Sequence, residues 1–311
     1  MQKYKIDYLI GTGQTALVYL AHTEDGLPVA LKSPREEVRR DPEKAARFAT
    51  EVNLSLRLSH PHLVRALAGK PLGEDAYLCL EYFGEGALDQ HLGKHGRLPL
   101  EEALKLASQV ALALAHVHAN GILHRDVKAA NVFLRGGNAF LGDFGVAIPV
   151  GRQTVAAGSP FYMAPEVYRD GISSTASDAY SMGVLAYELL SGTRPFEGDS
   201  YEALMAAHLS NYPRSLSARC PELPRATLRT VERALAKSSE ERPSVAELAA
   251  ALEGGLRSLR GEAEPAPAPE PEPERPLGRH GARSSEPAAP ANGENPRSTT
   301  LFQRVFGKKR S

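Results

Sequence analysis

The sequence lacks tryptophan altogether, and aromatic residues make up only 6% of its 311 residues. Cysteine is almost as scarce. Cys79 and Cys220 lie far apart, without the spacing of a metal or redox motif, and we interpret both as small core residues. Neither sign of charge is in excess, because 37 Lys and Arg residues balance 37 Asp and Glu residues. A binding surface for nucleic acid is therefore not expected.

Long apolar runs are absent as well. No stretch of about 18 uninterrupted apolar residues exists that would suit a transmembrane segment. Only a short apolar run follows Lys3 and Lys5, which is not typical of a signal peptide. The ten histidines do not follow a metal-binding spacing. We expect a cytoplasmic protein with a sizeable core, whose length suits one large or two ordinary domains.

The first eighty residues consist mainly of predicted strands. Apolar runs are separated by turn residues, among them Gly11-Thr12-Gly13 and the hairpin signal Asp25-Gly26. Glycines between two strands allow backbone N–H groups to approach a phosphate, although hairpin glycines are also common without that role. We predict strands over residues 4–10, 17–21, 29–32, 63–68 and 76–80.

One helix is predicted within this region. Asp41 is a suitable N-cap residue, and Pro42 suits the first helical position. Phe48, Val52 and Leu56 recur at helical spacing and should form the inward face.

Two charged residues lie in apolar surroundings. Lys32 is a lone cation in an apolar strand, and Glu51 borders the apolar face of the predicted helix. Each could simply reach solvent, but burying an unpaired charge is costly. We therefore favour a Lys32–Glu51 pair.

The remainder of the chain is mainly helical in pattern. A long Ala- and Leu-rich helix is predicted over 100–119, and Asn120-Gly121 ends it. A second apolar helix opens at Ser177 and runs to Leu190, and Ser244-x-x-Glu247 is a capping box for the last helix.

The most informative stretch is His124-Arg125-Asp126-Val127-Lys128-Ala129-Ala130-Asn131, followed by Asp143-Phe144-Gly145. It places a carboxylate, a cation, an amide and a second carboxylate on two short loops. Phosphoryl transfer needs such a set, because a group must orient the hydroxyl, a cation must steady the phosphoryl group, and oxygen ligands must hold Mg²⁺.

These motifs, with Gly11-x-Gly13, Val18 and Val29-Ala30-Leu31-Lys32 before them, resemble those of protein kinases in kind and order, over roughly residues 4–255. The chain is similar to eukaryotic-like (Hanks-type) serine/threonine protein kinases, and its composition suggests a bacterial member. The resemblance implies an α+β, two-lobed fold, with a small antiparallel sheet and one helix in residues 1–82 and a mainly helical lobe in 83–259.

The resemblance also implies a role for each polar residue of the motifs. In the implied catalytic set, Asp126 orients the substrate hydroxyl, Lys128 contacts the γ-phosphate, and Lys32, paired with Glu51, contacts the α- and β-phosphates. Asn131 and Asp143 are the implied ligands of Mg²⁺, with Mn²⁺ as a second candidate. Lys128, two residues after Asp126, is typical of Ser/Thr kinases.

ATP is the implied nucleotide, held by the Gly-rich loop and by a hinge at residues 81–86. The implied contacts are Ile10, Gly11, Thr12, Gly13, Val18, Ala30, Lys32, Leu80, Glu81 and Phe83. Ala16 stands where the family has its third glycine, so we expect a stiffer or displaced loop.

Residues 146–163 resemble an activation segment, and Gly158 to Glu166 resemble the substrate-docking loop of Ser/Thr kinases. Thr154 is the phosphosite candidate there, with a plain loop threonine as the alternative. The implied architectural residues are Arg125, which can receive the phosphate; Ser159, bridging Asp126 and Lys128; Asp178, holding the catalytic-loop backbone; and Glu166 paired with Arg242. Tyr180 occupies the place of a usual tryptophan.

Near residue 260 the composition becomes rich in Pro, Ala and Glu. Such a segment cannot bury enough apolar surface to offset chain entropy, so we predict a disordered tail over 260–311. Its end, 296–311, combines an apolar helical stripe with a basic run. It suits a regulatory partner or an anionic membrane surface, or it is a frayed terminus.

The implied partners are protein substrates and, for autophosphorylation in trans, a transient homodimer. Two other classes compete with an active protein kinase. A pseudokinase scaffold would bind partners through the tail but should have lost part of the catalytic set, which is complete here. A small-molecule kinase of related fold would lack the docking loop at Gly158 to Glu166.

Overall fold

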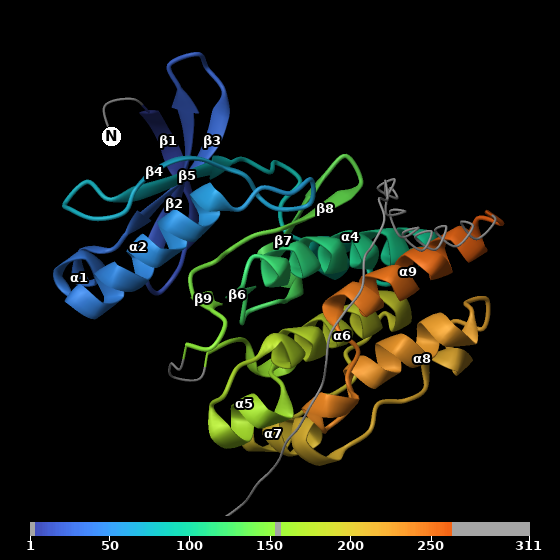
Figure 1. Ribbon diagram of the computed structural model, residues 1–311. Helices are drawn as coiled ribbons and strands as arrows, with labels where there is room; N and C mark the ends of the chain where they lie inside the picture. The colour runs from blue at the N-terminus through green and yellow to red at the C-terminus, as the bar shows by residue number, and fades with distance from the viewer. Residues whose placement is uncertain (1–3, 153–156, 263–311) are drawn as a thin grey trace, which may run out of the picture. The chain divides into compact units, whose positions relative to one another are not determined.

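A five-stranded antiparallel sheet forms the first part of the molecule (Figure 1). The computed structural model describes residues 4–152 and 157–262. The sheet has the order β1-β2-β3-β5-β4, and its edge strand β4 pairs with β5 alone. Its strands are β1 (Tyr4–Thr12), β2 (Ala16–Thr23), β3 (Pro28–Pro34), β4 (Ala66–Lys70) and β5 (Tyr77–Glu81).

One long helix, α2 (Pro42–Arg57), packs against this sheet. Asp41 accepts hydrogen bonds from two backbone N–H groups of the first turn, and Pro42 occupies the first helical position, which confirms the predicted start. Phe48 and Val52 are buried against the sheet, but Leu56 is 44% exposed. The prediction for Leu56 was wrong, and a short helix, α1 (Glu36–Arg40), precedes α2 without having been expected.

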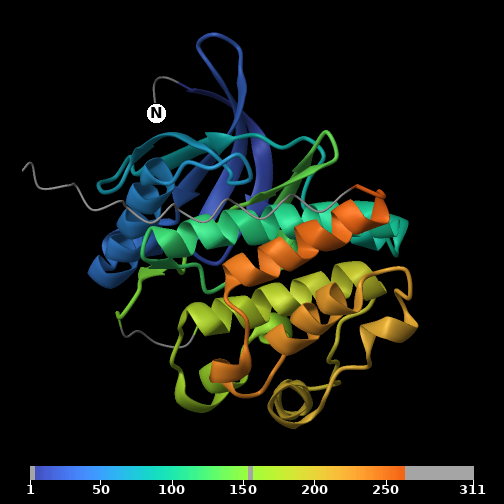
Figure 2. The same ribbon diagram turned by 45° about the vertical axis from the view of Figure 1, so that its right-hand side comes forward.

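The second part of the molecule is mainly helical. Figures 1 and 2 show α4 and α9 side by side, with α6 next to them, and this group contributes much of the largest apolar core. The helices are α3 (Leu88–His95), α4 (Leu100–Ala119), α5 (Pro165–Asp170), α6 (Thr175–Ser191), α7 (Tyr201–Ser210), α8 (Arg225–Ala234) and α9 (Val245–Leu259).

Two short ladders position the loops that carry the polar motifs. β6 (Ile122–Leu123) pairs with β9 (Ile148–Pro149), and β7 (Val132–Arg135) pairs with β8 (Asn138–Leu141). Residues 124–131 lie between β6 and β7, and Asp143 lies two residues after the end of β8. The ladders therefore bring the two loops to the same end of this region.

Most predicted elements are confirmed, with differences at their ends. Helix α6 starts two residues early, because Ser174 is its N-cap and Ser177 completes a capping box. Strand β4 begins at Ala66, and Leu63 makes only an isolated bridge to Leu141. The capping box of Ser244 with Glu247 is confirmed.

The fold is α+β, with an antiparallel sheet and helix preceding a mainly helical lobe. The boundary between residues 82 and 83 stays a prediction. The expected disordered tail lies outside the described residues from 263 onward. Within the described ranges, no helix combines the length and apolarity that crossing a membrane requires. Both cysteines are buried free thiols.

Candidate active site

Asp178 on α6 holds the loop that precedes Asp126. Its carboxylate accepts hydrogen bonds from the backbone N–H groups of His124 and Arg125, both at 2.8 Å. His118 Nε2 lies 2.8 Å from Asp178 Oδ2. Arg125 has a φ of 70°, a region that side chains other than glycine rarely adopt. The buried carboxylate thus stabilises a strained backbone next to Asp126.

The two oxygens of the Asp126 carboxylate differ in their hydrogen bonding. Oδ2 lies 2.7 Å from Lys128 Nζ and accepts a hydrogen bond from Asn131 Nδ2 at 3.0 Å. Oδ1 is buried and has no hydrogen-bond partner among the described residues. Because a buried acceptor is costly when unsatisfied, this oxygen is suited to receive a hydroxyl group from a bound molecule.

The loop bearing Asp143 lies directly beside the loop bearing Asn131. The N–H of Gly142 donates to the Asn131 carbonyl at 2.9 Å, and His124 Nε2 lies 3.0 Å from the Gly142 carbonyl. Asp143 itself has a φ of 62°; in the described part of the chain it shares a positive φ only with Arg125 and glycines. The two strained residues therefore belong to the two adjoining loops.

Lys32 joins the sheet, helix α2 and the Asp143 loop. Its Nζ lies 2.5 Å from Glu51 Oε1 and 2.9 Å from Asp143 Oδ1. Burial alone would lower the pKa of Lys32, but the carboxylates of Glu51 and Asp143 together raise it above its usual value. Lys32 in turn lowers the pKa of Asp143 to about 2, and burial raises the pKa of Glu51 while Lys32 opposes that effect.

Asn131 and Asp143 have the chemistry of ligands for a hard divalent cation. The amide nitrogen of Asn131 is engaged with the Asp126 carbonyl at 2.8 Å and with its carboxylate, so its amide oxygen is left for another partner. Asp143 stays anionic at any physiological pH because of its low pKa. An amide oxygen and a carboxylate are the donors that Mg²⁺ prefers, so these residues fit that ion.

The Gly-rich turn lies between β1 and β2. Gly11 pairs with Val18, and Gly13 N–H donates to the Ala16 carbonyl at 2.9 Å. Ala16 is buried in β2 and does not adopt a positive φ. Ala16 therefore does not need the conformational freedom of glycine, because this residue already belongs to the strand. A stiffer or displaced loop stays a prediction. Ile10 and Thr12, the other predicted contacts of the loop, lie at the end of β1.

Arg35 also contacts this loop, and the sequence interpretation missed it. Its Nε donates to the Gly13 carbonyl at 2.9 Å, and its backbone N–H donates to the Thr15 carbonyl at 2.9 Å. The register of β2 with β3 pairs Ala16 with Pro34, so residue 35 must lie beside residue 15. Extending the Asp25-Gly26 hairpin residue by residue would have indicated this contact.

The remaining predicted nucleotide contacts lie along β3, β5 and the segment that follows. Ala30 pairs with Leu80 across β3 and β5, and Glu81 ends β5. Phe83 is buried, with its ring centroid 5.7 Å from that of Phe133. The contact of these residues with a nucleotide stays a prediction.

The predicted docking loop is partly held by hydroxyl groups. Tyr168 Oη donates to the Pro160 carbonyl at 2.6 Å, and Ser181 Oγ donates to the Tyr162 carbonyl at 2.7 Å. Ser159 lines one small cavity with Asp126, but the described residues show no hydrogen bond from its hydroxyl to Asp126 or Lys128. Its bridging role stays a prediction, and Thr154 lies outside the described residues.

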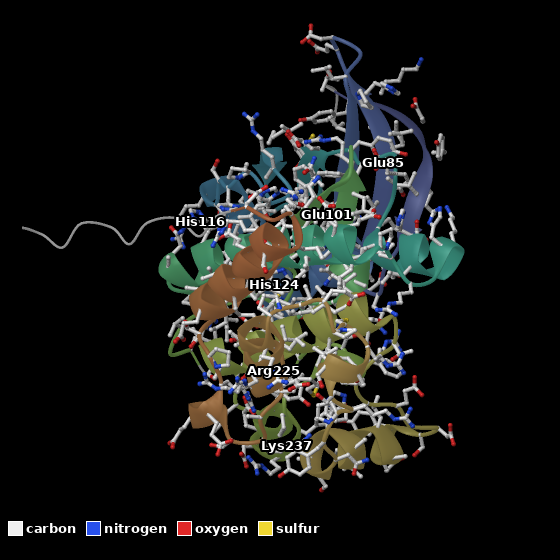
Figure 3. All side chains as sticks on the ribbon, turned by 90° about the vertical axis from the view of Figure 1, so that its right-hand side faces the viewer. Glu85, Glu101, His116, His124, Arg225 and Lys237 are labelled. Carbon is white, nitrogen blue, oxygen red and sulfur yellow. The ribbon has the colours of Figure 1, made fainter. Side chains whose placement is uncertain are left out.

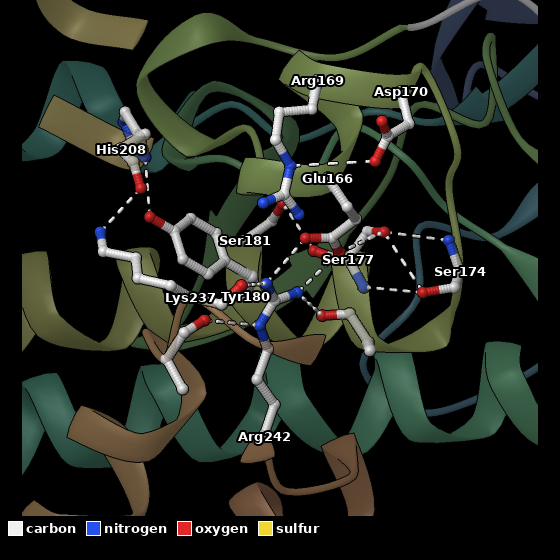
Figure 4. A network of polar contacts seen from close by, with 12 residues as sticks. Glu166, Arg169, Asp170, Ser174, Ser177, Tyr180, Ser181, His208, Lys237 and Arg242 are labelled. Atoms are coloured by element: carbon white, nitrogen blue, oxygen red, sulfur yellow. Dashed lines mark hydrogen bonds and ion pairs between the residues drawn. The ribbon is translucent and has the colours of Figure 1, made fainter. Parts of the chain in front are cut away.

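A buried ion pair fixes the end of this loop (Figure 4). Arg242 contacts both carboxylate oxygens of Glu166 at 2.7 Å, and its side chain is fully buried. Its Nε donates to the Ala236 carbonyl at 2.9 Å, and Ser177 Oγ donates to Glu166 Oε1 at 2.9 Å. Most hydrogen-bonding groups of the pair are thus used, as a buried pair requires.

Known proteins resemble this chain over the region just described. The sequence profile of the family described as "Protein kinase domain" matches residues 4–251. The chain is 34% identical over 257 residues to serine/threonine-protein kinase PrkC of Bacillus subtilis, an alignment that covers 79% of this chain and 39% of PrkC. It is 34% identical over 271 residues to serine/threonine-protein kinase PkaA of Streptomyces coelicolor, covering 80% and 49%.

A third relative is serine/threonine-protein kinase PknA of Mycobacterium tuberculosis, 33% identical over 281 residues, with 85% of this chain and 64% of PknA covered. The chain thus spans less than two thirds of the length of each of these three relatives. The profile match over residues 4–251 spans all the loops of the candidate site.

Proposed function

The chain belongs to the protein kinase family, in its bacterial Hanks-type branch, and on this premise we propose that it transfers the γ-phosphoryl group of ATP to serine and threonine hydroxyls of proteins. The observation that carries the proposal is the buried Oδ1 of Asp126, which lies beside Lys128 and Asn131 and has no hydrogen-bond partner in the described part of the chain. This oxygen can accept a hydrogen bond from one substrate hydroxyl, next to the ammonium group of Lys128 and the amide group of Asn131.

In the proposed reaction, the substrate hydroxyl donates its hydrogen bond to Asp126 Oδ1. The hydroxyl oxygen forms a bond to the γ-phosphorus as the bond from that phosphorus to the bridging oxygen of ADP breaks. The hydroxyl proton passes to Asp126, and Lys128 stabilises the charge of the transferred phosphoryl group. Positioning and charge stabilisation, and no covalent enzyme intermediate, account for the catalysis.

Members of this family use ATP with a divalent metal ion. We propose Mg²⁺ as the ion, with Mn²⁺ as a substitute, held by Asn131 and Asp143. A bound divalent cation supplies charge neutralisation for the phosphates. Lys32, whose charge Glu51 and Asp143 secure, is proposed to bind the α- and β-phosphates.

The proposal is tested by incubating the purified full chain with γ-labelled ATP, Mg²⁺ and a generic protein acceptor. Asp126→Asn should lower labelling by about 10²- to 10⁴-fold, the usual contribution of a general base, while binding of a fluorescent ATP analogue is retained. The matched control is Asp170→Asn, an exposed aspartate whose carboxylate lies 3.8 Å from Arg169. Phosphoamino-acid analysis should find label on serine and threonine.

Equal labelling by wild type and Asp126→Asn would contradict the proposal. The scaffold alternative predicts nucleotide binding without labelling in either protein, also after a phosphomimetic replacement at Thr154 and with several acceptors. Label on an added aminoglycoside or choline, and none on protein, would favour the small-molecule alternative.

Protein substrates and a transient homodimer for autophosphorylation in trans are the partners we propose. The labelling rate per molecule should then rise with protein concentration. Docking of residues 296–311 on a regulatory partner or an anionic membrane concerns residues outside the described part, and deleting them tests it. The cytoplasmic location stays a prediction.

A further inference from the structure

Arg135, the last residue of β7, contacts two residues of the segment that joins the sheet to the helical part. Its Nη2 lies 3.0 Å from Oε2 of Glu81. Its guanidinium carbon lies 4.7 Å from the ring centroid of Phe83 and 4.9 Å from that of Phe140. One side chain therefore binds the carboxylate of Glu81 and the aromatic face of Phe83 at the same time.

The β7–β8 hairpin dictates where Arg135 lies. Its register pairs Phe133 with Phe140 and Arg135 with Asn138, and the turn between the strands is Gly136-Gly137. Both glycines have a positive φ, of 58° and 68°, as a tight two-residue hairpin turn requires. The guanidinium is thus carried by a short, well-defined hairpin.

Two further hydrogen bonds join the same hairpin to the same segment. Leu134 N–H donates to the Gly86 carbonyl at 3.0 Å, and Gly136 N–H donates to Oε1 of Glu85 at 2.7 Å. In Figure 3, Glu85 is labelled beside the N-terminal strands, above the level of Glu101 on α4. Residues 81, 83, 85 and 86 are therefore all bound to one hairpin, which limits the freedom that Gly84 and Gly86 would otherwise allow.

The contact of Arg135 requires an arginine. The ion pair is half exposed, and such a pair is weak when it acts alone. A planar guanidinium can lie over aromatic rings and still bind a carboxylate with its edge, whereas an ammonium group cannot do both equally well. The Phe83 and Phe140 rings, 4.9 Å apart, form a preformed surface for it.

We propose that Arg135 is a positioning residue for the adenine-binding backbone of this kinase, fixing residues 81–83 in the conformation that receives the base. The inference rests on the proposed function, in which ATP is the substrate and this segment binds its adenine. Glu81 and Phe83 are the two residues of the segment proposed to contact the nucleotide, and Arg135 binds both. A backbone held before binding loses less conformational freedom when the ligand arrives, which increases affinity.

The test measures dissociation constants of the full chain for ATP, ADP and adenosine by displacement of a fluorescent ATP analogue. Arg135→Gln keeps a polar side chain but removes the charge and the stacking group. We expect it to weaken all three ligands by a similar factor of about 5 to 20, because the effect acts on the base that they share. Arg135→Lys should recover only part of the loss.

The matched control is Arg260→Gln, which breaks another half-exposed pair. Arg260 Nε lies 2.8 Å from Oε1 of Glu101, which Figure 3 labels on α4. This variant should bind all three ligands within about twofold of wild type. Turnover at saturating ATP should be nearly unchanged in Arg135→Gln, so the KM for ATP changes while kcat does not, a split that a general loss of folding would not produce.

Each outcome decides the inference. Equal affinities of Arg135→Gln and Arg260→Gln would overturn it. So would a loss for ATP and ADP without a loss for adenosine, because Arg135 would then act on the phosphates. If wild type binds neither ATP nor adenosine, the proposed function fails together with the inference, whereas normal wild-type binding and an unaffected Arg135→Gln remove the inference alone.

Discussion

The hydroxyl oxygen of Tyr180 lies 2.8 Å from Nδ1 of His208, and both side chains are completely buried. The bond joins α6 to α7, and the His208 ring also contacts Phe196, with centroids 4.9 Å apart. Lys237 Nζ donates to the His208 carbonyl at 2.7 Å, so the residue is held at both its side chain and its backbone (Figure 4). Tyrosine in place of the usual tryptophan is thus matched by a histidine whose Nδ1 can accept a hydrogen bond from the tyrosine hydroxyl.

Removing the Tyr180 hydroxyl should destabilise the protein. In Tyr180→Phe the ring remains, but His208 Nδ1 is left buried without its partner. We expect a loss of about 1–3 kcal/mol in the free energy of unfolding, measured by urea denaturation. Tyr212→Phe is the control, because Tyr212 is 83% exposed, and it should change stability by less than about 0.5 kcal/mol. Equal effects would show that the buried bond contributes nothing.

His208 should make stability depend on pH. Burial, with a smaller contribution from the charge of Lys237, lowers its pKa to about 4. The unfolded chain has an ordinary pKa near about 6.5 and binds a proton between these values that the folded protein does not. The contribution of His208 to stability should therefore be constant above about pH 7 and fall as the pH is lowered towards 4, by up to about 1.4 kcal/mol per pH unit.

His208→Asn tests this, since asparagine offers an acceptor near the Nδ1 position but does not titrate. The unfolding free energies of wild type and variant, measured from pH 7 to pH 4.5, should converge as the pH falls. Other histidines titrate in both proteins and cancel in the difference. Parallel curves would show that His208 does not contribute the proposed pH dependence.

Replacing one or both residues of the Lys32–Glu51 pair should affect stability and activity differently. Lys32→Met leaves Glu51 buried without its cation, which should cost about 3–5 kcal/mol in the free energy of unfolding. In Lys32→Met/Glu51→Leu both charges are gone, and much of that loss should be recovered, because an apolar pair can replace a buried ion pair. Both proteins should fail to transfer labelled phosphate. A double variant no more stable than the single one would contradict this account.

The sequence allowed good prediction where the physical signal is local. The cap at Asp41, the hairpin at Gly26 and the capping box at Ser244 each depend on a few neighbouring residues, and the structure has all three. Lys32 and Glu51, buried charges in apolar patterns, could also be paired by reasoning. The catalytic roles came from resemblance to a family, not from local physics.

What the sequence did not disclose depends on packing between distant segments. Arg135 and Phe83 are 52 positions apart, and nothing in either neighbourhood indicates that they meet. The same holds for Tyr180 and His208. Leu56 shows that helical spacing alone does not predict burial, since this residue continues the apolar pattern of α2 but remains partly exposed to solvent.

Replacing Ala16 by the family's glycine should not improve nucleotide binding. Ala16 already lies in β2 with an ordinary φ, 3% exposed, and pairs with Pro34. Ala16→Gly should lower the free energy of unfolding by about 0.5–1 kcal/mol, because glycine has more freedom in the unfolded chain. Affinity for the fluorescent ATP analogue should stay within about twofold. Markedly tighter binding would show that alanine constrains the loop after all.

Arg242→Lys should destabilise the protein far more than the same change at a surface pair. Arg242 binds both oxygens of Glu166 at 2.7 Å and three backbone carbonyls, and lysine cannot reproduce this planar fork. Because the site is fully buried, the unmade bonds should cost about 2–4 kcal/mol in the free energy of unfolding, measured in urea. Arg260→Lys at the exposed Glu101 pair is the control, expected within about 0.5 kcal/mol of wild type. Similar losses at both positions would mean that burial and bidentate geometry do not set the strength of the Glu166 anchor.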